Sequence, residues 1–567
     1  MKIVAVAAVA ALPFGALAQT AADLRADATT PGTVLNIGMG QGQQRFSALD
    51  QINKTTVKRL VPVWNYSLND DRGQESQPMV WEGVMYVTSH KDTVALDAKS
   101  GRQLWKHSIE YPPETPRIVC CGILNRGAAL YEGKLFRTTL DANVIALDQK
   151  TGEQIWKAKA GDIKDGQSQT VAPLVANGVV ITGISGGEYG IRGYIDGWDP
   201  DNGTHLWRRY TVAGEGEKGA DTWPGDTWKR GGAPTWITGS YDPDLNLVYW
   251  GTGNGGPWNA EFRKGDNLYI ASVIAVRPKT GEIVWHYQFS PNDPFDYDAV
   301  AEPVLADIDV NGTQRKVLMQ ANRNGYFYVL DRATGELLAA NQYIEKLNWA
   351  DGIDMKTGRP IDSELTKKVR TSGEAVDIFP SAFGGKNWFP MSYNPGTGLA
   401  YSNTLNFGLT YKFIEPKFQY GTMYVGYDFS TAKWIPPEEG QALGYLKAID
   451  PMTGKSKWKV PLDVPNWSGT ITTAGGLVFT GSQTGEFAAY DADTGAKLWK
   501  FQTGSGIISQ PVTWEADGRQ YITTTSGSGG AFALYSAALP GFSEELVKTL
   551  ANVPAGGSVW TFALIEE

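Results

Sequence analysis

Two adjacent cysteines, Cys120 and Cys121 in "RIVCCGILNRG", are the only cysteines among 567 residues. A nucleophilic thiol needs a base, but the four histidines lie in or next to repeated phrases and have no thiol near them in sequence. Two thiols alone also make a poor zinc site. We therefore expect a disulfide between the two neighbours; the alternative is a surface pair without a role.

A bridge between neighbours closes a small, strained ring. Adjacent Cα atoms are ~3.8 Å apart, whereas most disulfides join Cα atoms ~4.4–6.8 Å apart. Strain of this kind persists only where the surrounding structure over-determines it, and such places cluster at functional sites. The pair is therefore a candidate functional site, and the rest of the chain must position it.

A repeated phrase indicates the scaffold. Each copy has an apolar run, then Asp-x-x-Thr-Gly or a near variant, then three residues that are usually followed by Trp. The seven copies are "VALDAKSGRQLWKH", "VIALDQKTGEQIWKA", "DGWDPDNGTHLWRRY", "VIAVRPKTGEIVWHY", "YVLDRATGELLAAN", "LKAIDPMTGKSKWKV" and "AAYDADTGAKLWKFQ". The Asp accepts hydrogen bonds from its own turn and the Gly takes a positive φ, so each copy predicts a β-hairpin.

The tryptophans give the period of the repeat. Trp105, Trp156 and Trp207 recur every 51 residues, and Trp458 and Trp499 are 41 residues apart. This is the period of a four-stranded propeller blade. A large ring at the same place in each hairpin can pack between neighbouring sheets, so we expect these tryptophans to be packing residues rather than ligands.

The ends of the chain complete the count of blades. Leu338 stands in place of Trp in the fifth copy, and the segments around Trp64 and Trp560 are half-repeats. Pairing these terminal strands in one shared blade closes the ring and removes both sheet edges. The sequence therefore predicts an all-β fold, an eight-bladed β-propeller, with short helices such as residues 544–551.

Composition and the N-terminal residues predict the cellular compartment of the protein. Residues 1–18 have a basic Lys2, an apolar run and a small-x-small ending, which indicates a secretory signal peptide. Residues 19–567 contain no linker-like stretch, so we expect one domain, exported to the periplasm, where a disulfide can persist. The net charge of −9 and pI near 5.3 argue against nucleic-acid binding. No later apolar run predicts a membrane span.

Three features together resemble one protein family. Repeats with the pattern D-x-x-T-G-x-x-x-W, a "CC" followed by "NRG", and "DYD" further along are similar to the alcohol dehydrogenases that depend on pyrroloquinoline quinone (PQQ), the methanol and ethanol quinoprotein group. The resemblance extends over nearly the whole mature chain. It implies an eight-bladed propeller in which the vicinal disulfide lies against one face of the flat quinone.

The resemblance also implies the cofactor contacts. Trp236 in "GGAPTWITG" matches the ring that stacks opposite the cysteine pair, and Arg323 in "NRNGYFYVLD" matches a cation beside the reactive carbonyl. Taken singly, residues of these types are typical of loops and core positions, and only the joint pattern indicates a cofactor. The other matching contacts are Glu75, Arg126, Thr170, Ser185, Gly186, Gly187, Thr235, Asn387, Trp467, Gly530 and Ala531.

A metal site and a base follow from the same resemblance. Its metal ligands are Glu188, Asn254, Asp296 and Asp298, an oxygen-only set of the kind that hard cations such as Ca²⁺ prefer. Members that use a lanthanide ion typically carry Asp at the position of Asp298, but the surrounding "NDPFDYDAVAEPV" departs from their usual wording. We expect Ca²⁺, with a lanthanide ion as the alternative. Without an ion, "DYD" is a solvated acidic turn.

The implied activity is oxidation of a small-molecule alcohol by hydride transfer to PQQ, with Asp296 as the base. No C-x-x-C-H haem motif occurs in the chain, so the resemblance implies a separate soluble c-type cytochrome as electron acceptor. A homodimer is left open. The alternative function is a non-enzymatic propeller scaffold of the cell envelope, and a six-bladed sugar dehydrogenase is disfavoured by the number of repeats.

An expanded, aromatic-rich stretch separates the fifth and sixth copies, from about residue 340 to 445. A segment of this length is either a lid over the pocket or an interaction loop, and the sequence does not distinguish them. The small residues of "GGAF" around Gly530 indicate a roomier pocket than that of methanol specialists, and so larger alcohols.

Overall fold

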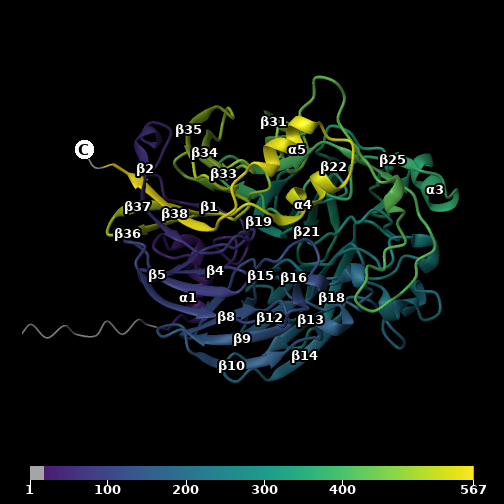
Figure 1. The fold of residues 1–567 in the computed structure, drawn as a ribbon, viewed down its shortest axis with the longest axis horizontal. Coiled ribbons are helices and arrows are strands. Elements are labelled where there is room, and N and C mark those ends of the chain that lie inside the picture. Colours follow the sequence, from purple (N-terminus) through teal and green to yellow (C-terminus); the bar gives the residue numbers. More distant parts are fainter. Residues whose placement is uncertain (1–17, 566–567) are drawn as a thin grey trace, which may run out of the picture.

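The computed structural model describes residues 18–565 (Figure 1). Apart from Ala18, the predicted signal peptide lies outside these residues. Strands dominate the described range, as predicted, and no helix within it is long and apolar enough to cross a membrane. The α-helices of this range are α1 (Ala21–Ala26), α2 (Thr115–Ile118), α3 (Glu364–Thr371), α4 (Gly530–Ala538) and α5 (Glu544–Ala551).

Eight sheets of four or five strands contain most of the strands within residues 18–565. The first four are β3 (Met79–Trp81), β4 (Val84–Thr88), β5 (Asp92–Asp97), β6 (Gln103–Ser108); β7 (Ala129–Tyr131), β8 (Lys134–Thr138), β9 (Asn143–Asp148), β10 (Gln154–Lys159); β11 (Leu174–Ala176), β12 (Val179–Gly183), β13 (Tyr194–Trp198), β14 (His205–Tyr210); and β15 (Ser240–Asp242), β16 (Leu247–Gly251), β17 (Ser272–Val276), β18 (Ile283–Gln288).

The other four sheets contain the remaining repeats and both ends of the chain. They are β19 (Val304–Val310), β20 (Thr313–Ala321), β21 (Tyr326–Asp331), β22 (Leu337–Gln342); β26 (Ser392–Asn394), β27 (Leu399–Leu405), β30 (Gly444–Ile449), β31 (Ser456–Leu462); β1 (Phe46–Ser47), β32 (Thr470–Thr473), β33 (Leu477–Gly481), β34 (Glu486–Asp491), β35 (Lys497–Gln502); and β2 (Leu60–Ser67), β36 (Val512–Ala516), β37 (Arg519–Ser526), β38 (Ser558–Leu564).

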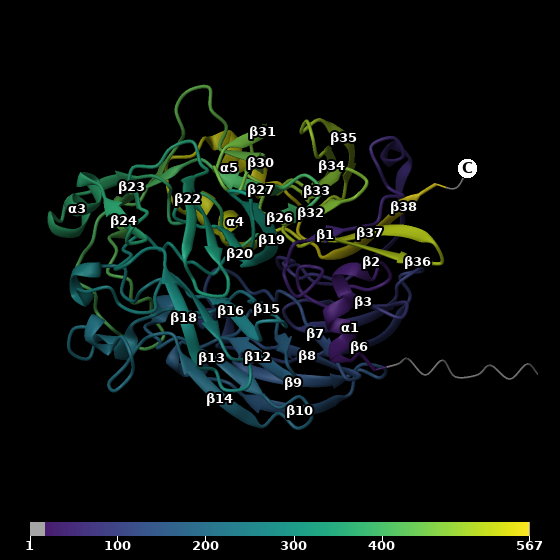
Figure 2. The same cartoon turned by 180° about the vertical axis from the view of Figure 1, so that it is seen from behind.

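The two terminal half-repeats share one sheet, as predicted. β2 pairs antiparallel with β38, from Leu60 opposite Leu564 to Ser67 opposite Ser558. In Figure 1 the purple β2 lies beside the yellow β36 to β38, and Figure 2 shows the same arrangement from behind. The first and last strands of the repeat region are therefore hydrogen-bonded to each other.

Each repeat tryptophan packs on the next sheet. The indole Nε1 of Trp105 donates to the carbonyl oxygen of Gln149, in the turn of the following copy, at 3.0 Å. The ring also covers Gly152 of that turn, where a Cβ atom would lie 2.5 Å from the indole. The same hydrogen bond recurs from Trp64 to Ala98, Trp156 to Pro200, Trp207 to Pro278, Trp458 to Ala492 and, returning to β2, Trp499 to Leu60.

The fifth copy differs from the prediction. Ala339, opposite Val329, occupies the register position that Trp105 takes opposite Ala95, so Ala339 rather than Leu338 replaces the tryptophan. The side chain of Asn341, two residues later, donates to Met452 at 2.8 Å and links this sheet to the next. The alignment by sequence was therefore shifted by one residue.

Part of the expanded stretch belongs to one of the large sheets. Residues 340–445 include β26 and β27, which belong to one of the eight large sheets. The rest forms two small sheets and α3. The small sheets are β23 (Ala350–Asp354) with β24 (Arg359–Asp362), and β25 (Val376–Ile378) with β28 (Gly408–Tyr411) and β29 (Trp434–Ile435).

An N-terminal segment, residues 31–47, joins six of the large sheets. Its backbone is hydrogen-bonded to one strand of each of these sheets, at β36, β3, β15, β19, β26 and β32. Within it, the side chain of Arg45 is 1% exposed and donates to Gln77 at 2.9 Å and to Gln510 at 2.6 Å. The sequence pattern gave no sign of this segment, because it has neither the repeat phrase nor strand periodicity.

Candidate active site

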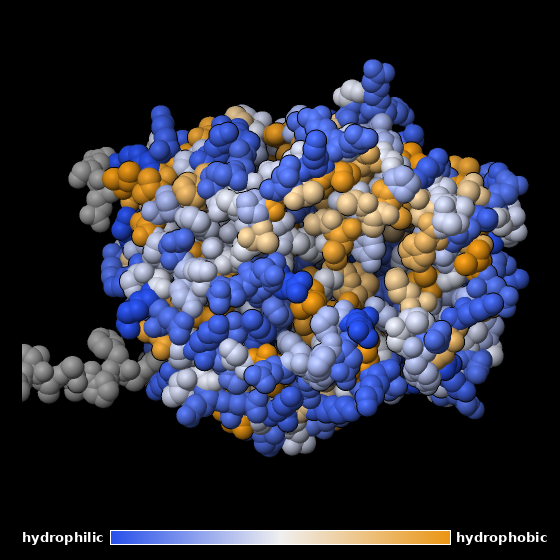
Figure 3. Space-filling view, in the orientation of Figure 1, coloured by the Kyte–Doolittle hydropathy of each residue, from blue (hydrophilic) through white to orange (hydrophobic). Residues whose placement is uncertain are grey.

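One cavity gathers most of the predicted site residues. It has about 650 Å³ of empty space, including its opening to solvent. Apolar side chains gather around α4 on the face seen in Figure 3, and α4 supplies Ala531 to the cavity. The lining residues are Glu75, Cys120, Cys121, Leu124, Arg126, Thr170, Ser185, Gly186, Glu188, Trp236, Asp296, Asp298, Arg323, Phe383, Asn387, Trp388 and Ala531.

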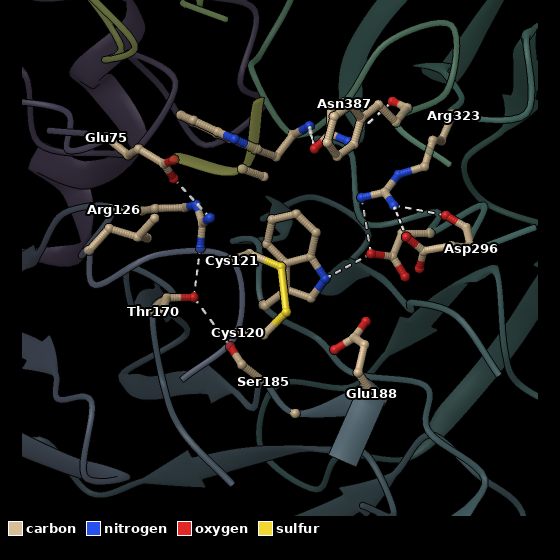
Figure 4. Close-up of a pocket in the computed structure, with 17 residues that line it drawn as sticks. Glu75, Cys120, Cys121, Arg126, Thr170, Ser185, Glu188, Asp296, Arg323 and Asn387 are labelled. Carbon is tan, nitrogen blue, oxygen red and sulfur yellow. Dashed lines mark hydrogen bonds and ion pairs between the residues drawn. A yellow bond between two sulfur atoms is a disulfide. The ribbon is translucent and has the colours of Figure 1, made fainter. Parts of the chain in front are cut away.

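The cysteine pair is a disulfide, which confirms that prediction, and neither cysteine is free. It follows α2 and lies at the cavity with Cys121 exposed and in the left-handed region, at φ 67°. Figure 4 shows the bridge at the centre of the cluster of lining side chains. Since the bridge lines the cavity, the alternative of a surface pair away from any site does not fit.

A chain of polar contacts runs along one rim of the cavity (Figure 4). Arg126 forms a 2.8 Å ion pair with Glu75 and donates to the Thr170 hydroxyl at 2.6 Å, and Thr170 and Ser185 hydroxyls are 3.2 Å apart. Burial raises the pKa of Glu75 to about 7, although Arg126 opposes the shift. The rim therefore offers donors to a bound anion beside a carboxyl that titrates near neutrality.

Trp236 contacts residues at both ends of the cavity. The guanidinium carbon of Arg126 lies 4.7 Å from the centroid of its ring, and its Nε1 donates to Asp298 Oδ2 at 3.0 Å. That hydrogen bond fixes the plane of the indole. A flat aromatic ligand between this indole and the disulfide would have an apolar surface on each face.

Acidic groups crowd the other end. Asp296 has a left-handed backbone, at φ 64°, a conformation that Asp tolerates better than most residues but that still has a cost. Arg323 lies 3.1 Å from Asp296 Oδ2 and 3.1 Å from Asp298 Oδ2. The other carboxylate oxygen of Asp296, Oδ1, is buried and has no hydrogen-bond partner among the described residues.

The acidic groups hold protons more tightly than usual. Burial, followed by repulsion from Asp298, raises the pKa of Glu188 to about 7, and burial raises the pKa of Asp293 to about 6. Burial also raises the pKa values of Asp296 and Asp298, against the attraction of Arg323. One guanidinium thus faces four carboxyl groups, and a further positive charge would be favourable here.

Asn254 completes this acidic cluster. One end of its side-chain amide lies 3.2 Å from Asp298 Oδ1 and 3.3 Å from Glu188 Oε1, and the other end lies 3.0 Å from Trp258 Nε1. With the amide nitrogen toward the carboxylates, both the nitrogen and the oxygen of the Asn254 side chain have hydrogen-bond partners. With the amide oxygen toward them, three oxygens face one another, which only a cation between them would favour.

The fit of a metal ion follows from this donor set. Within residues 18–565, no three His, Cys, Asp or Glu side chains are grouped closely enough to hold an ion by themselves. An ion at this place therefore needs the Asn254 oxygen, and oxygens of solvent or of a bound ligand, besides the carboxylates. Hard cations take six to eight oxygens of such mixed origin, so the residues fit Ca²⁺ or a lanthanide ion.

Five predicted residues lie beside the cavity rather than on its wall. Gly187 and Gly530 are close to site residues, because a Cβ would lie 2.8 Å from Asn254 Oδ1 and 2.9 Å from Glu75 Oε1, respectively. Thr235 is buried and accepts from the backbone N–H of Ile184 at 2.8 Å. The other two are Asn254 and Trp467; the latter is fully buried and its Nε1 has no partner among the described residues.

Four residues of the site were not predicted. Leu124, Phe383 and Trp388 line the cavity, and Asp293, whose charge acts on Asp296, accepts from Tyr297 N at 2.8 Å. The ring of Trp388 lies 5.0 Å from the guanidinium carbon of Arg126, on which Trp236 also packs. Trp388 directly follows Asn387 in "GGKNW", but its type alone does not distinguish a pocket wall from a core position.

Comparison with known proteins agrees with this geometry. The family described as PQQ-type "Glucose/ethanol/alcohol dehydrogenase, beta-propeller domain" matches residues 36–342 and 366–522. A quinoprotein alcohol dehydrogenase of Pseudomonas putida, PedH, is 40% identical over 95% of the chain and 92% of the relative. A quinoprotein ethanol dehydrogenase of Pseudomonas aeruginosa is 40% identical over 96% of the chain and 92% of the relative.

A solved structure shares the fold over nearly the whole length of this chain. A europium-containing methanol dehydrogenase superposes with a TM-score of 0.90 at 36% identity, covering 96% of this chain and all of that chain. The chain belongs to the PQQ-dependent quinoprotein alcohol dehydrogenases. It is thus an enzyme of the β-propeller dehydrogenase class, and the scaffold alternative is not favoured.

Proposed function

We propose that the chain oxidises alcohols to aldehydes or ketones at the cavity around Asp296, with PQQ between the Cys120–Cys121 bridge and Trp236. The observation that carries this proposal is the convergence of the disulfide, the Trp236 indole and Asp296 on one cavity from segments far apart in sequence. Glu75, Arg126, Thr170, Ser185 and Asn387 would hold the rim of the cofactor.

The ion is a hard cation held by Glu188, Asn254, Asp296 and Asp298. Ca²⁺ and a lanthanide ion are the two candidates, and the extra carboxylate of Asp298 suits a trivalent ion. The relative of known structure that is named for europium supports testing the second candidate. When bound, PQQ supplies a carbonyl that accepts hydride and the ion supplies a Lewis acid that polarises it.

The chain's own residues do the remaining work. Asp296 Oδ1, which lacks a partner in the described structure, would accept the hydroxyl proton of the alcohol. Burial raises the pKa of Asp296 in the metal-free chain, but a cation in contact with this carboxylate would weaken it as a base, so positioning of the alcohol must supply part of the rate. Arg323 fixes the orientation of that carboxylate, while Trp236 and the disulfide hold the flat ligand and exclude water from its faces.

Several further features belong to the proposal. Residues 19–567 would form one domain whose eight large sheets are the blades of a closed ring; the hydrogen bonds from Trp499 to Leu60 and from β38 to β2 support closure. We also propose export to the periplasm by a signal peptide at residues 1–18, and electron transfer to a separate soluble c-type cytochrome. The acidic net charge would suit a basic partner. Association into a homodimer stays a prediction.

The decisive experiment is reconstitution of the metal-free protein with PQQ and either Ca²⁺ or La³⁺. Dye-linked oxidation of a panel of primary and secondary alcohols is then measured for the wild type and for Asp296→Asn. We expect activity only with PQQ and one of the two ions, and none with the variant. Full turnover by Asp296→Asn, with the ion still bound, would remove Asp296 from the role of base.

A further inference from the structure

A buried ion pair lies behind the wall of the cavity. The Lys386 ammonium is 2.9 Å from Glu302 Oε2, and the two side chains are 0% and 2% exposed. Neither residue lines the cavity. A pair buried to this degree contributes little net stability and often weakens the fold relative to apolar residues, so its presence beside the site calls for a role other than stability.

The pair joins the two segments that build opposite parts of the site. Glu302 follows Asp296 and Asp298 on the segment that leads into β19, and its other oxygen, Oε1, accepts from Met391 N at 2.7 Å. Lys386 also donates to the carbonyl oxygen of Asn387 at 3.2 Å. One carboxylate therefore contacts both ends of the stretch from Lys386 to Met391.

That stretch supplies a wall of the cavity. Residues 383–391 contribute Phe383, Asn387 and Trp388 to the lining. The same residues support Arg323, because Gly385 N donates to the Arg323 carbonyl oxygen at 2.9 Å. Gly384 packs so closely on Arg323 that a Cβ would lie 2.0 Å from its Cγ. Any shift of residues 383–391 would therefore move Asn387, Trp388 and Arg323 together.

The charge around the Lys386–Glu302 pair is positive, as the binding of an anionic ligand requires. Burial lowers the pKa of Lys386 against the attraction of Glu302, and the charges of Arg45 and Arg323 lower it further. Arg45 is itself buried, and Gln510, which accepts from it, donates to the Glu75 carbonyl oxygen at 3.2 Å. Two buried cations, Arg45 and Lys386, thus act on the single carboxylate of Glu302 behind the cavity. A multiply charged carboxylate ligand would be attracted from this side.

We propose that Lys386 and Glu302 are positioning residues for the cofactor: their ion pair holds residues 383–391 against the acidic segment, so that Asn387 and Trp388 face the cavity before the ligand enters. A preformed site loses less conformational entropy on binding. Loss of the ion pair should therefore lower the affinity for the cofactor. The inference rests on the proposed placement of PQQ.

The test compares two buried lysine–glutamate ion pairs in the full chain. Lys386→Met removes the pair behind the cavity, and Lys447→Met removes a pair of the same kind, Lys447 with Glu345 at 2.9 Å, which does not line the cavity. PQQ is titrated into each metal-loaded protein, with tryptophan fluorescence quenching and the absorbance of the bound quinone as readouts. Thermal unfolding of the same samples measures stability separately.

Lys386→Met is expected to weaken PQQ binding by roughly 10- to 100-fold, the range found when groups that orient ligands are lost, while Lys447→Met binds like the wild type. Lys386→Arg should recover most of the affinity. If Lys386→Met does not fold, the double variant Lys386→Met/Glu302→Gln, which leaves no unpaired buried charge, carries the same expectation. Equal PQQ affinity of the two lysine variants overturns this inference alone, whereas no PQQ binding by the wild type overturns the proposed placement as well.

Discussion

Arg323 holds Asp296 through two different groups. Its Nη1 donates to the Asp296 carbonyl oxygen at 2.8 Å and lies 3.1 Å from the carboxylate Oδ2. The backbone contact supports the left-handed conformation of Asp296, at φ 64°, and the side-chain contact orients its carboxylate. One guanidinium therefore stabilises both the strained backbone and the direction of the proposed base.

Replacing this guanidinium should reduce turnover more than substrate binding. In Arg323→Lys, a single ammonium cannot contact the Asp296 carbonyl, its carboxylate and Asp298 together. We expect kcat to fall by about 100-fold, the lower end of what a positioned general base contributes, with a smaller change in KM. Steady-state kinetics check this. Arg315→Lys, at a partly exposed arginine paired with Asp331 and Glu336, is the control and should keep wild-type kcat.

The raised pKa of Glu75 predicts a pH dependence of stability. Its pKa is about 7 in the folded protein, mainly through burial, against an ordinary value of 4.5. The folded state therefore prefers the protonated acid, and stability falls as pH rises from about 4.5 to 7, by about 3 kcal/mol for this group. Glu75→Gln removes this slope, so the variant should gain stability relative to the wild type across that range.

Thermal unfolding of metal-free, PQQ-free protein at several pH values measures this difference. Exposed Glu153→Gln is the control and should run parallel to the wild type. A constant offset between Glu75→Gln and the wild type from pH 5 to 8 would show that Glu75 is already ionised when folded.

The disulfide is expected to matter for the site and little for the fold. A bridge between neighbours constrains almost no loop in the unfolded chain, and the loop-entropy contribution grows with loop length. Gentle reduction, or the double change Cys120→Ser and Cys121→Ser, should therefore lower PQQ affinity and dye-linked activity while the melting temperature changes little. Thiol titration of untreated native protein should find no free thiol. Undiminished activity after complete reduction would argue against the stacking role.

The sequence was most informative where a residue type has few uses. Adjacent cysteines, the Asp-x-x-Thr-Gly turns and the repeat tryptophans each have one dominant physical explanation, and the disulfide, the hairpins and the packing between sheets were predicted from them. Trp64 and Trp560 likewise indicated the shared terminal sheet. Local pattern and tertiary contact point to the same structure at these positions.

The sequence was uninformative where a function depends on tertiary neighbours. Leu124, Phe383 and Trp388 are indistinguishable by type from core residues, and only the fold shows that they line a cavity. Residues 31–47 have no periodicity because they contact six sheets through backbone groups. Lys386 and Glu302 are ordinary charged residues in sequence, and only their burial makes them notable. In the fifth repeat the predicted tryptophan position was Leu338 instead of Ala339, because that copy has no tryptophan to fix its alignment.

Packing and backbone strain can be measured separately at two glycines, Gly152 in a repeat turn and Gly83 in the turn between β3 and β4. Gly152 and Gly83 both have φ 75°, but a Cβ at Gly152 would lie 2.5 Å from the Trp105 ring, whereas at Gly83 nothing lies within 4 Å. Gly83→Ala should cost only the left-handed strain, about 1–2 kcal/mol. Gly152→Ala adds displacement of the indole and of its hydrogen bond to Gln149, for about 1–3 kcal/mol more. Urea unfolding of both variants measures the difference, and equal destabilisation would mean that the tryptophan packs too loosely to couple neighbouring sheets.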